Sequence, residues 1–502
     1  MRTTFLISFI YLLIVPLQLL ASDDQTDPLS GFIEQGMSDW HVPGMAVAVT
    51  TESEVLFQKG FGTIGADGGD AIDEHTLFAI ASTTKAMIAA SILILVDEEK
   101  ITLDDLAIKH LPELQFGDTS MNGQVTIRDL LTHRTGLGST DFWEFAEDMP
   151  LSEQVTRLQL VKPSVSLRSA FQYQNTMFQI LGLIVESVSG RSWEEFLRTR
   201  IWLPLGMNET FAARTGFKRG QKFVLPYFYE NDEFTQAKWD FEPDHSDAAG
   251  SVWSSISDMT KWAQFLLRGG VTVDGERLLS EASISEMFQP QMLIQPGGSY
   301  PTVALTKPNW TSYGLGWFQQ DFQGRKIDFH TGSLSGLIAL IGLDRAHSKA
   351  VIVLGNRDHA EMRHAVLWRV MDQRPLESMP DWNADISDLY QKARDEGDKY
   401  WKEVVATRLQ DTQTSLAADA YLWTYENATM GHLTIVKTKD GLRLNTRKDY
   451  MDLSHWHLDT FLVQRNDLNQ RFLISFQINT EGKVQSLDLF GDVFEKLEEP
   501  EK

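Results

Sequence analysis

The feature that most constrains this chain is a serine–lysine pair at the start of a long apolar run. Ser82 and Lys85 stand at the head of segment 86–96, which contains neither Gly nor Pro. An apolar run of this length without a breaker predicts a buried helix. On a helix, residues three positions apart lie on one face, about one turn apart. The segment therefore predicts a hydroxyl and an amine held together where a buried helix begins.

This pair has the chemistry of an activated nucleophile. Burial favours neutral lysine, and a neutral amine at Lys85 is a candidate base for the Ser82 hydroxyl. The unpaired N–H groups at the start of the helix also point toward any anion that forms near Ser82. A Ser-x-x-Lys spacing arises by accident in a chain of this length, so the interpretation depends on companion motifs.

The first companion is Tyr173-Gln174-Asn175, which precedes an amphipathic run through Leu181 and Val185. Two residues apart in a turn, Tyr173 and Asn175 can point into the same cleft. The phenol can relay a proton, and the amide can bond a substrate carbonyl.

The second companion is the segment His330-Thr331-Gly332-Ser333, which joins two strand-like runs. Gly332 lets a substrate approach the backbone of an edge strand closely. The N–H of Ser333 is a candidate second donor to an oxyanion, beside that of Ser82.

In this order the three motifs resemble those of the serine β-lactamase and penicillin-binding-protein superfamily, whose set is S-x-x-K, then Y-x-N or S-x-N, then K-T-G. The resemblance is greatest to the class C β-lactamase-like branch, which includes esterases, D-aminopeptidases and LACTB-like proteins. It covers about residues 28–375. Further similar stretches are 127–137, 204–210, 249–255 and 313–317.

The resemblance implies an acyl-enzyme mechanism that needs no metal or organic cofactor. Ser82 attacks a carbonyl, while Lys85 and Tyr173 handle its proton. The residues do not decide which of the two is the base, and both can titrate as one coupled unit. By role, the expected site residues are the catalytic Ser82, Lys85 and Tyr173, the substrate-binding Asn175, His330, Thr331 and Gly332, and the oxyanion donors Ser82 and Ser333.

The third motif departs from the superfamily pattern, because His330 stands where most β-lactamases have lysine. That lysine is a fixed charge that helps to grip a substrate carboxylate. Histidine, with an unperturbed pKa of about 6.5, is largely neutral at pH 7 and acts mainly as a hydrogen-bond partner. We therefore expect esters or peptide and amide substrates to be favoured over β-lactams. A rate limb in the imidazole range that vanishes in His330→Lys would support this role of His330.

Several alternatives remain open from the sequence. The chain is alternatively a β-lactamase or DD-carboxypeptidase acting on β-lactams or peptidoglycan peptides. It is alternatively a catalytically silent scaffold that binds such ligands in the same cleft. A third possibility makes the C-terminal part a ligand- or partner-binding module.

The order of strand and helix patterns predicts an α+β fold. Strand candidates 45–50 and 55–62 precede a mostly helical middle, and strand patterns return after it. This order suits a central antiparallel sheet flanked by helices, plus a helical lobe, with the motifs at their boundary. Outside the helical middle, the expected elements are helix 29–40, strands 45–50, 55–62, 313–322, 327–329, 337–343 and 350–354, and helix 361–371.

The C-terminal part predicts a small antiparallel β-barrel-like domain. A Lys439-Asp440-Gly441 turn fits a hairpin there. His455, His457 and Asp459 would share one strand face, a spacing that also suits a metal, but their neighbours favour a structural role. The expected strands are 421–425, 432–438, 442–445, 460–463, 472–478 and 484–490. The expected division is a signal peptide at 1–22, a hydrolase domain at 28–375, a helical linker at 376–410 and the β-domain at 411–502.

The composition of the chain limits which classes of binding partner and of catalytic site are expected. The 502-residue chain has a net charge of −24, which argues against nucleic acid or an anionic membrane as its main partner and leaves a small-molecule or peptide substrate. It has no cysteine, which excludes a thiol nucleophile and zinc thiolate or iron–sulfur sites.

The apolar stretch 5–20 predicts export to the periplasm or medium, or an anchor if uncleaved; no later segment suits a membrane span. The sequence carries no signal for an oligomeric state.

Overall fold

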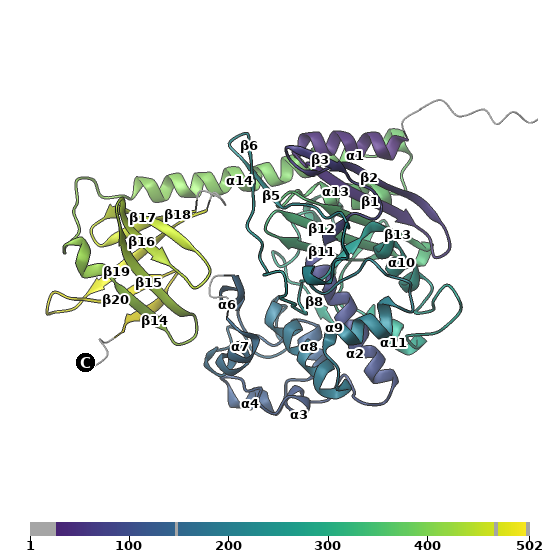
Figure 1. Cartoon of the computed structure of the whole chain (residues 1–502), viewed down its shortest axis with the longest axis horizontal. Coiled ribbons are helices and arrows are strands. Elements are labelled where there is room, and N and C mark those ends of the chain that lie inside the picture. The colour runs from purple at the N-terminus through teal and green to yellow at the C-terminus, as the bar shows by residue number, and fades with distance from the viewer. Residues whose placement is uncertain (1–26, 146–148, 466–469, 498–502) are drawn as a thin grey trace, which may run out of the picture.

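The computed structural model describes residues 27–145, 149–465 and 470–497. Figure 1 shows a larger part made of a sheet and a lobe of helices, a smaller barrel, and one long helix that runs between them. The predicted signal peptide lies outside the described residues. Within these residues, no helix combines the length and the apolar character that crossing a membrane requires.

A nine-stranded antiparallel sheet forms the centre of the larger part. Its middle strands are buried along their whole length, because helices cover both faces of the sheet. In spatial order the strands are β3 (Gly68–Ala71), β2 (Val55–Gly65), β1 (Gly44–Thr50), β13 (Lys349–Gly355), β12 (Leu337–Asp344), β11 (Arg325–Leu334), β10 (Phe318–Phe322), β9 (Thr311–Tyr313) and β8 (Met292–Leu293).

The two faces of the sheet belong to separate cores. Along β1, Ala46 and Ala48 join the core on one side, while Val47 and Val49 join the core on the other, as the alternation of a strand requires. α10 (Ile256–Leu267) packs on β1 and β13 from the first side. The second side is covered by α1 (Pro28–Asp39), α13 (Met362–Met371) and the start of α14 (Trp382–Ala406).

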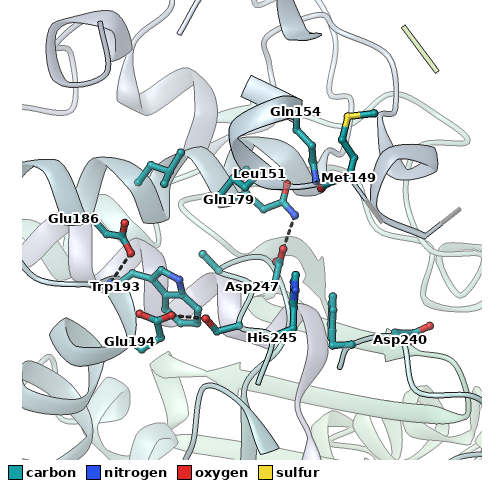
Figure 2. Close-up of a pocket in the computed structure, with 14 residues that line it drawn as sticks. Met149, Leu151, Gln154, Gln179, Glu186, Trp193, Glu194, Asp240, His245 and Asp247 are labelled. Carbon is teal, nitrogen blue, oxygen red and sulfur yellow. Dashed lines mark hydrogen bonds between the residues drawn. The ribbon is translucent and has the colours of Figure 1, made fainter. Parts of the chain in front are cut away.

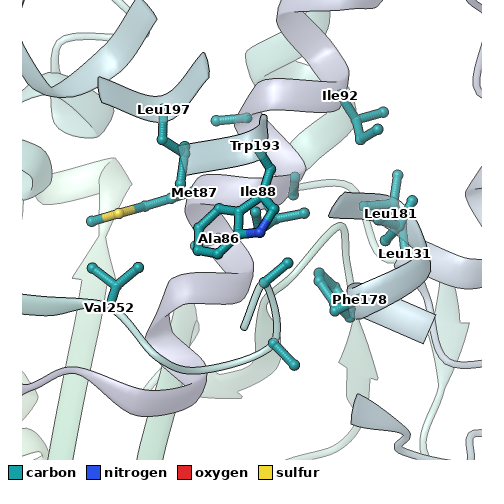
Figure 3. Close-up of a cluster of buried hydrophobic side chains, with 14 of the residues drawn as sticks. Ala86, Met87, Ile88, Ile92, Leu131, Phe178, Leu181, Trp193, Leu197 and Val252 are labelled. Atoms are coloured by element: carbon teal, nitrogen blue, oxygen red, sulfur yellow. The ribbon is translucent and has the colours of Figure 1, made fainter. Parts of the chain in front are cut away.

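The helical lobe is arranged around α2 (Thr84–Asp97), which begins after the 3₁₀ turn η1 (Ala81–Thr83). Almost the whole of α2 is buried, which explains why its sequence is apolar on every face. Figure 3 shows Met87 and Ile92 of α2 among side chains from α5, α8 and α9. The other α-helices of the middle region are α3 (Ala107–His110), α4 (Thr119–Asn122), α5 (Ile127–Leu131), α6 (Asp141–Phe145), α7 (Leu151–Arg157), α8 (Asn175–Ser189), α9 (Trp193–Leu197), α11 (Glu281–Met287) and α12 (Val303–Thr306).

Small elements complete the larger part. Two short two-stranded sheets pair β4 (Leu77–Ala79) with β7 (Trp253–Ser255) and β5 (Tyr227–Glu230) with β6 (Glu233–Gln236). The short helical turns are η2 (Leu158–Leu160), the π-helical η3 (Arg198–Trp202), η4 (Arg214–Gly216), η5 (Arg345–His347) and η6 (Leu376–Ser378).

The α+β prediction is confirmed, although several strands differ from their predicted bounds or were not predicted. The predicted elements 29–40, 45–50 and 350–354 agree with α1, β1 and β13 to within one residue at each end. The predicted single strand 313–322 is wrong, because it is the hairpin of β9 and β10. Its turn contains Gly316 at φ +80°, where a Cβ would lie 3.0 Å from the Lys85 carbonyl oxygen. The strand predicted at 327–329 is longer and runs on to Leu334 as β11.

The C-terminal part is a closed eight-stranded antiparallel barrel, which confirms the predicted small β-domain. The sequence predicted six of its strands and missed β17 and β21, in which polar and charged residues outnumber the buried ones. The hairpin at Lys439-Asp440 is present, since Thr438 pairs with Gly441. After η7 (Ala418–Tyr421) the strands are β14 (Trp423–Asn427), β15 (Gly431–Thr438), β16 (Gly441–Asn445), β17 (Tyr450–His457), β18 (Thr460–Arg465), β19 (Gln470–Ile478), β20 (Val484–Leu489) and β21 (Asp492–Lys496).

The three residues considered as a metal site do not share one strand face. A register shift between His455 and His457 breaks the alternation of β17, and Asp459 lies beyond its end. His455 Nε2 contacts the Leu458 carbonyl oxygen at 2.9 Å, and His457 Nδ1 accepts a bond from the Leu409 N–H. Asp459 accepts hydrogen bonds from Ser415. In the part of the chain that the structure describes, no group of three His, Asp or Glu residues is placed to hold a metal ion.

The barrel also touches the helical lobe directly. The indole N–H of Trp143 in α6 donates to the Thr429 carbonyl oxygen at 2.6 Å, and Arg157 of α7 donates to the Ala428 carbonyl oxygen at 2.6 Å. Both oxygens lie in the turn between β14 and β15. The helix α14 lies within the stretch predicted as a linker and joins the barrel to the larger part. The contacts of Trp143 and Arg157 join the two parts as well.

The barrel has a core of its own, and this predicts a separate response to core mutations. Leu433→Ala is expected to lower the free energy of unfolding of the barrel by about 2–5 kcal/mol, because it leaves a cavity among fully buried side chains. Leu340→Ala, its matched control in the sheet, is expected to act on the larger part instead. Scanning calorimetry should show one transition shifted in each variant; equal shifts of both transitions would contradict separate cores.

Candidate active site

Ser82 lies in a turn that the surrounding backbone holds tightly. The turn η1 follows β4 directly, and the Ile80 N–H donates to the Val252 carbonyl oxygen at 2.8 Å. Ala81 is fully buried with φ +45°, a left-handed conformation that costs an alanine energy. The Thr83 hydroxyl donates back to the Ile80 carbonyl oxygen. These contacts present the Ser82 side chain at the N-terminal end of α2.

Lys85 is fully buried, and its amine contacts three segments of the chain. Its Nζ lies 3.1 Å from Ser82 Oγ, one helical turn away. It also donates to Asn175 Oδ1 at 2.8 Å and to the Ala249 carbonyl oxygen at 2.7 Å. The hydroxyl and the amine therefore lie together as the spacing predicted.

Tyr173 lies beside this amine and packs on a buried histidine. The Lys85 Nζ is 5.0 Å from the centre of the Tyr173 ring. The ring of His133 lies 4.3 Å from that of Tyr173, and its Nδ1 accepts the Gln174 N–H. Burial, together with the charge of Lys85, holds the pKa of His133 well below its usual value, so this imidazole is neutral at pH 7.

Asn175 connects the site to α6. As the first residue of α8, it accepts a bond from Lys85 through Oδ1 and donates through Nδ2 to Asp141 Oδ1 at 3.1 Å. Asp141 begins α6, whose Trp143 is bonded to the barrel. The amide predicted to bind substrate is thus held between the lysine and a helix that the barrel contacts.

His330 is fully buried and bonded on both sides of its ring. Its Nε2 is 2.9 Å from the Tyr313 hydroxyl, and its Nδ1 is 2.6 Å from the Thr331 carbonyl oxygen. Burial and the charge of Lys85 lower its pKa to about 3. This lowered pKa favours the neutral form that the sequence predicted for pH 7, and it places the titration of His330 below the ordinary imidazole range.

The side chains of Thr331 and Ser333 contact two residues that the sequence reasoning missed, Tyr300 and the buried Arg363 respectively. The Thr331 hydroxyl is bonded to the hydroxyl of Tyr300, whose pKa burial raises to about 12. Arg363 donates to the Ser333 hydroxyl at 2.8 Å and to the Gly332 carbonyl oxygen at 2.6 Å. It also forms a buried ion pair with Glu361. The Thr331 side chain, predicted to bind substrate, is thus already engaged by Tyr300.

Gly332 makes room for the nucleophile turn itself. A Cβ at this position would lie 2.4 Å from the Ile80 carbonyl oxygen and 3.0 Å from the Ser82 nitrogen. β11 is an interior strand rather than the predicted edge strand, although β10 pairs with it no further than Phe329. The open edge beyond Phe329 receives η1. The glycine therefore brings the backbones of Ser82 and Ser333 close together, as two oxyanion donors require, while their roles stay predictions.

The structure gathers the predicted residues into one cluster and adds further members. Arg363, His133, Tyr313 and Asp141 were not predicted as site residues. His133 and Tyr313 fall in stretches that resembled the superfamily, but nothing in their local pattern shows that they pack on Tyr173 and His330. Asp129 anchors the loops on this side, since Arg134 and Arg168 both donate to its buried carboxylate.

Comparison with known proteins accords with this geometry. Residues 29–374 match a protein-family model described as beta-lactamase, and residues 407–500 match a domain of unknown function, DUF3471. The chain belongs to the beta-lactamase family. It is thereby a member of the serine β-lactamase and penicillin-binding-protein superfamily that its motifs resembled.

Curated relatives of this beta-lactamase family member include the unguisins hydrolase ungD′ of Aspergillus campestris, 27% identical over 405 residues, which are 74% of this chain and 71% of the relative. Protein flp of Staphylococcus aureus is 24% identical over 67% of this chain and 64% of its own length. Similar solved structures include the octameric penicillin-binding protein homologue from Pyrococcus abyssi, with a TM-score of 0.61 and 20% identity over 93% of this chain and 99% of that one. The D-amino acid amidase from Ochrobactrum anthropi SV3 has a TM-score of 0.53 and 22% identity over 66% and 91%. At these identities the structural likeness shows the fold alone.

The close contact at Gly332 predicts that adding one methyl group there strongly lowers activity and stability. Gly332→Ala is expected to abolish hydrolase activity, because β11 and the Ser82 turn must move apart, and to cost about 1–3 kcal/mol of stability. Gly397→Ala is the control, since a Cβ there meets nothing within 4 Å. Turnover of a chromogenic ester and urea unfolding measure the two effects. A fully active Gly332→Ala enzyme would contradict the close packing.

The buried neutral His330 predicts acid sensitivity of the fold. Between pH 6.5 and 3 the unfolded chain binds a proton at this residue that the folded chain does not, so stability falls as pH falls through this window. His330→Gln, which retains a partner for Tyr313, is expected to remove about 2 kcal/mol of the loss between pH 8 and pH 5. Urea unfolding at both pH values, with exposed His41→Gln as control, measures this. If the free energy of unfolding falls equally with pH in wild type and in His330→Gln, the predicted role of His330 in acid sensitivity is wrong.

Proposed function

We propose that this protein is an exported serine hydrolase that acts through an acyl-enzyme on esters or on peptide and amide substrates. The observation that carries the proposal is the contact of the buried Lys85 amine with Ser82 Oγ at 3.1 Å, at the start of α2. Export is supported by the apolar N-terminal stretch 5–20.

The geometry around Lys85 favours the lysine as the base. A neutral amine has two N–H donors and one lone pair. The oxygens of Asn175 and Ala249, at 2.8 and 2.7 Å, suit the two donors, which leaves the lone pair for the Ser82 hydroxyl. Lys85 would take the Ser82 proton as Oγ attacks the carbonyl carbon, and this proton would pass to the leaving group by way of Tyr173.

The oxyanion that forms in this step would lie between the Ser82 and Ser333 N–H groups. Gly332 supports this reading, because it lets the two backbones approach. Water would then attack the acyl-enzyme with the same base, which releases the acid and restores Ser82.

Labelling of the nucleophile tests the proposal. A fluorophosphonate is expected to form one adduct on Ser82 in the wild-type protein and none in Ser82→Ala. Lys85→Met is expected to lower ester turnover by about 100-fold or more, because the base is lost. Lys100→Met, just beyond the same helix, is the matched control and should retain activity. Peptide mapping by mass spectrometry locates the adduct; an adduct elsewhere, or an unlabelled active protein, would refute the acyl-enzyme.

The second candidate function is β-lactam hydrolysis, and the preferred substrate distinguishes it from hydrolysis of esters or amides. The names of relatives support hydrolysis and, in one case, amide chemistry. One curated relative is called a hydrolase of unguisins, and one structural neighbour is a D-amino acid amidase solved with L-phenylalanine amide. The neutral His330 supports the same choice, because it lacks the fixed charge that grips a β-lactam carboxylate. With purified enzyme, kcat/KM for an amino-acid ester or amide should exceed that for a penicillin; the reverse order would favour the β-lactamase alternative.

A further inference from the structure

A cavity of about 220 Å³ lies in the helical lobe, outside the cluster around Ser82. Helices α7, α8 and α9 and the segment 240–248 line it (Figure 2). Part of its wall is apolar, with Leu151, Leu183 and Trp193. The residues assigned to catalysis do not line it, so the proposed reaction leaves this space unexplained.

Four acidic residues from three elements of the fold line the cavity. Glu186 belongs to α8, Glu194 to α9, and Asp240 and Asp247 to the segment that follows β6. No Lys or Arg is among the lining residues that the structure describes. The cavity therefore carries a concentration of negative charge.

The hydrogen bonds to these carboxylates come from neutral groups. The main-chain N–H of Trp193 donates to the Glu186 carboxylate at 3.2 Å, and the Ser246 hydroxyl donates to the Glu194 carboxylate. Ser335 donates to Asp240, and the Ala249 N–H donates to Asp247 at 2.6 Å. Within the described chain none of the four carboxylates forms an ion pair. Lys448 of the barrel donates to the main-chain oxygen of Asp240 rather than to its carboxylate.

An ionised carboxylate without a positive partner in this cavity raises the free energy of the folded protein. Burial raises the pKa of Glu186 and of Asp240, which shows that their surroundings disfavour the ionised form. A bound cation would relieve that cost, since an opposite charge stabilises a desolvated carboxylate.

The distribution of the carboxylates points to an organic cation rather than a metal ion. In the described residues no three acidic or histidine side chains converge closely enough to hold a metal. The cavity is larger than an ion needs, and its apolar wall suits an alkyl arm.

A second observation also points to a ligand that donates hydrogen bonds. Gln154 of α7 is 3% exposed and lines the cavity. Its amide N–H group donates to the Met149 carbonyl oxygen at 2.8 Å, but its buried Oε1 accepts no hydrogen bond. Figure 2 shows this side chain extending from α7 toward the amide of Gln179. An acceptor left without a donor is the complement of an ammonium group.

We propose that this cavity binds a primary ammonium group carried on a short apolar arm. The carboxylates neutralise the charge, the Gln154 oxygen accepts one N–H, and the apolar wall covers the arm. The same chemistry has two sources, namely an amine on the substrate itself or a separate small amine.

The cavity adjoins the proposed catalytic lysine through two residues. Gln179 lies one helical turn after Asn175 on α8, and it donates to Asp247. Asp247 in turn bonds the N–H of Ala249, whose carbonyl oxygen accepts from Lys85. Only the residue Ala249 therefore separates Asp247, which an occupant of the cavity would contact, from the oxygen that accepts from Lys85.

Calorimetric titration of the full chain tests the site directly. Pentylamine is the probe, and 1-pentanol is the neutral control of the same shape. We expect pentylamine to bind with a Kd of about 1 mM or tighter and pentanol to bind far more weakly. Glu186→Gln and Glu194→Gln, on different helices, should each weaken binding about tenfold. Glu195→Gln is the matched control on the same helix as Glu194; the Glu195 carboxylate is paired with Arg198, and this variant should bind as wild type.

The melting temperature of each variant shows whether it is folded, and either carboxylate variant suffices for the test. Pentylamine that binds no better than pentanol, or that binds equally well to both Gln variants, overturns the proposal. Because binding is measured on Ser82→Ala as well as on wild type, this result does not depend on the proposed hydrolase activity.

Ester turnover in the presence of pentylamine then identifies the source of the ammonium, and this arm rests on the proposed function. Competitive inhibition indicates that the substrate carries the amine. A change in kcat with KM unchanged indicates a separate amine that acts through Asp247 and Ala249. Both results support the ammonium site.

Discussion

Lys85 is fully buried, and its amine meets oxygens from η1, from α8 and from the segment before β7. A buried amine needs partners, because an unpaired polar group in the interior costs several kcal/mol. The three segments that supply its partners are distant in the sequence and cannot separate without leaving the amine unsatisfied. Ser82, Asn175 and Ala249 are therefore held in one arrangement by a single side chain, and the rest of the site is built around it.

When this amine is protonated, its charge adds to burial in lowering the pKa of nearby histidines. His133 and His330 are both buried nearby, and both have pKa values lowered by burial and by Lys85. Two neutral imidazoles pack against the aromatic rings of Tyr173 and Tyr313 without adding charge. The positive charge of Arg363 is offset by Glu361 in a buried pair. The motif that lacks a lysine is thus supported by an arginine from α13, which binds its backbone and its Ser333 hydroxyl.

The barrel contributes to the same site through α6. Trp143 bonds to the turn between β14 and β15, and Asp141 of the same helix bonds to Asn175. On the other side, Lys448 of the barrel contacts Asp240, whose carboxylate holds Ser335 after β11. The barrel is thus linked to the predicted site in two ways, through α6 to Asn175 and through Asp240 to Ser335. This connection bears on the alternative in which the C-terminal part acts as a module of its own, because its contacts reach the residues that hold Asn175.

The sequence by itself determined what lies within one element of secondary structure. The spacing of Ser82 and Lys85 and the apolar run after them were enough to predict a buried helix with both groups on one face. Two companion motifs, which with this pair resemble those of a superfamily, then added Tyr173, Asn175 and the segment from His330 to Ser333. Only the tertiary structure decided that Gly332 accommodates the nucleophile turn, that Thr331 bonds to Tyr300, and that Arg363 and Asp141 complete the surroundings. The physical reason is that such contacts join residues far apart in the chain, and no local periodicity carries information about the packing that brings them together.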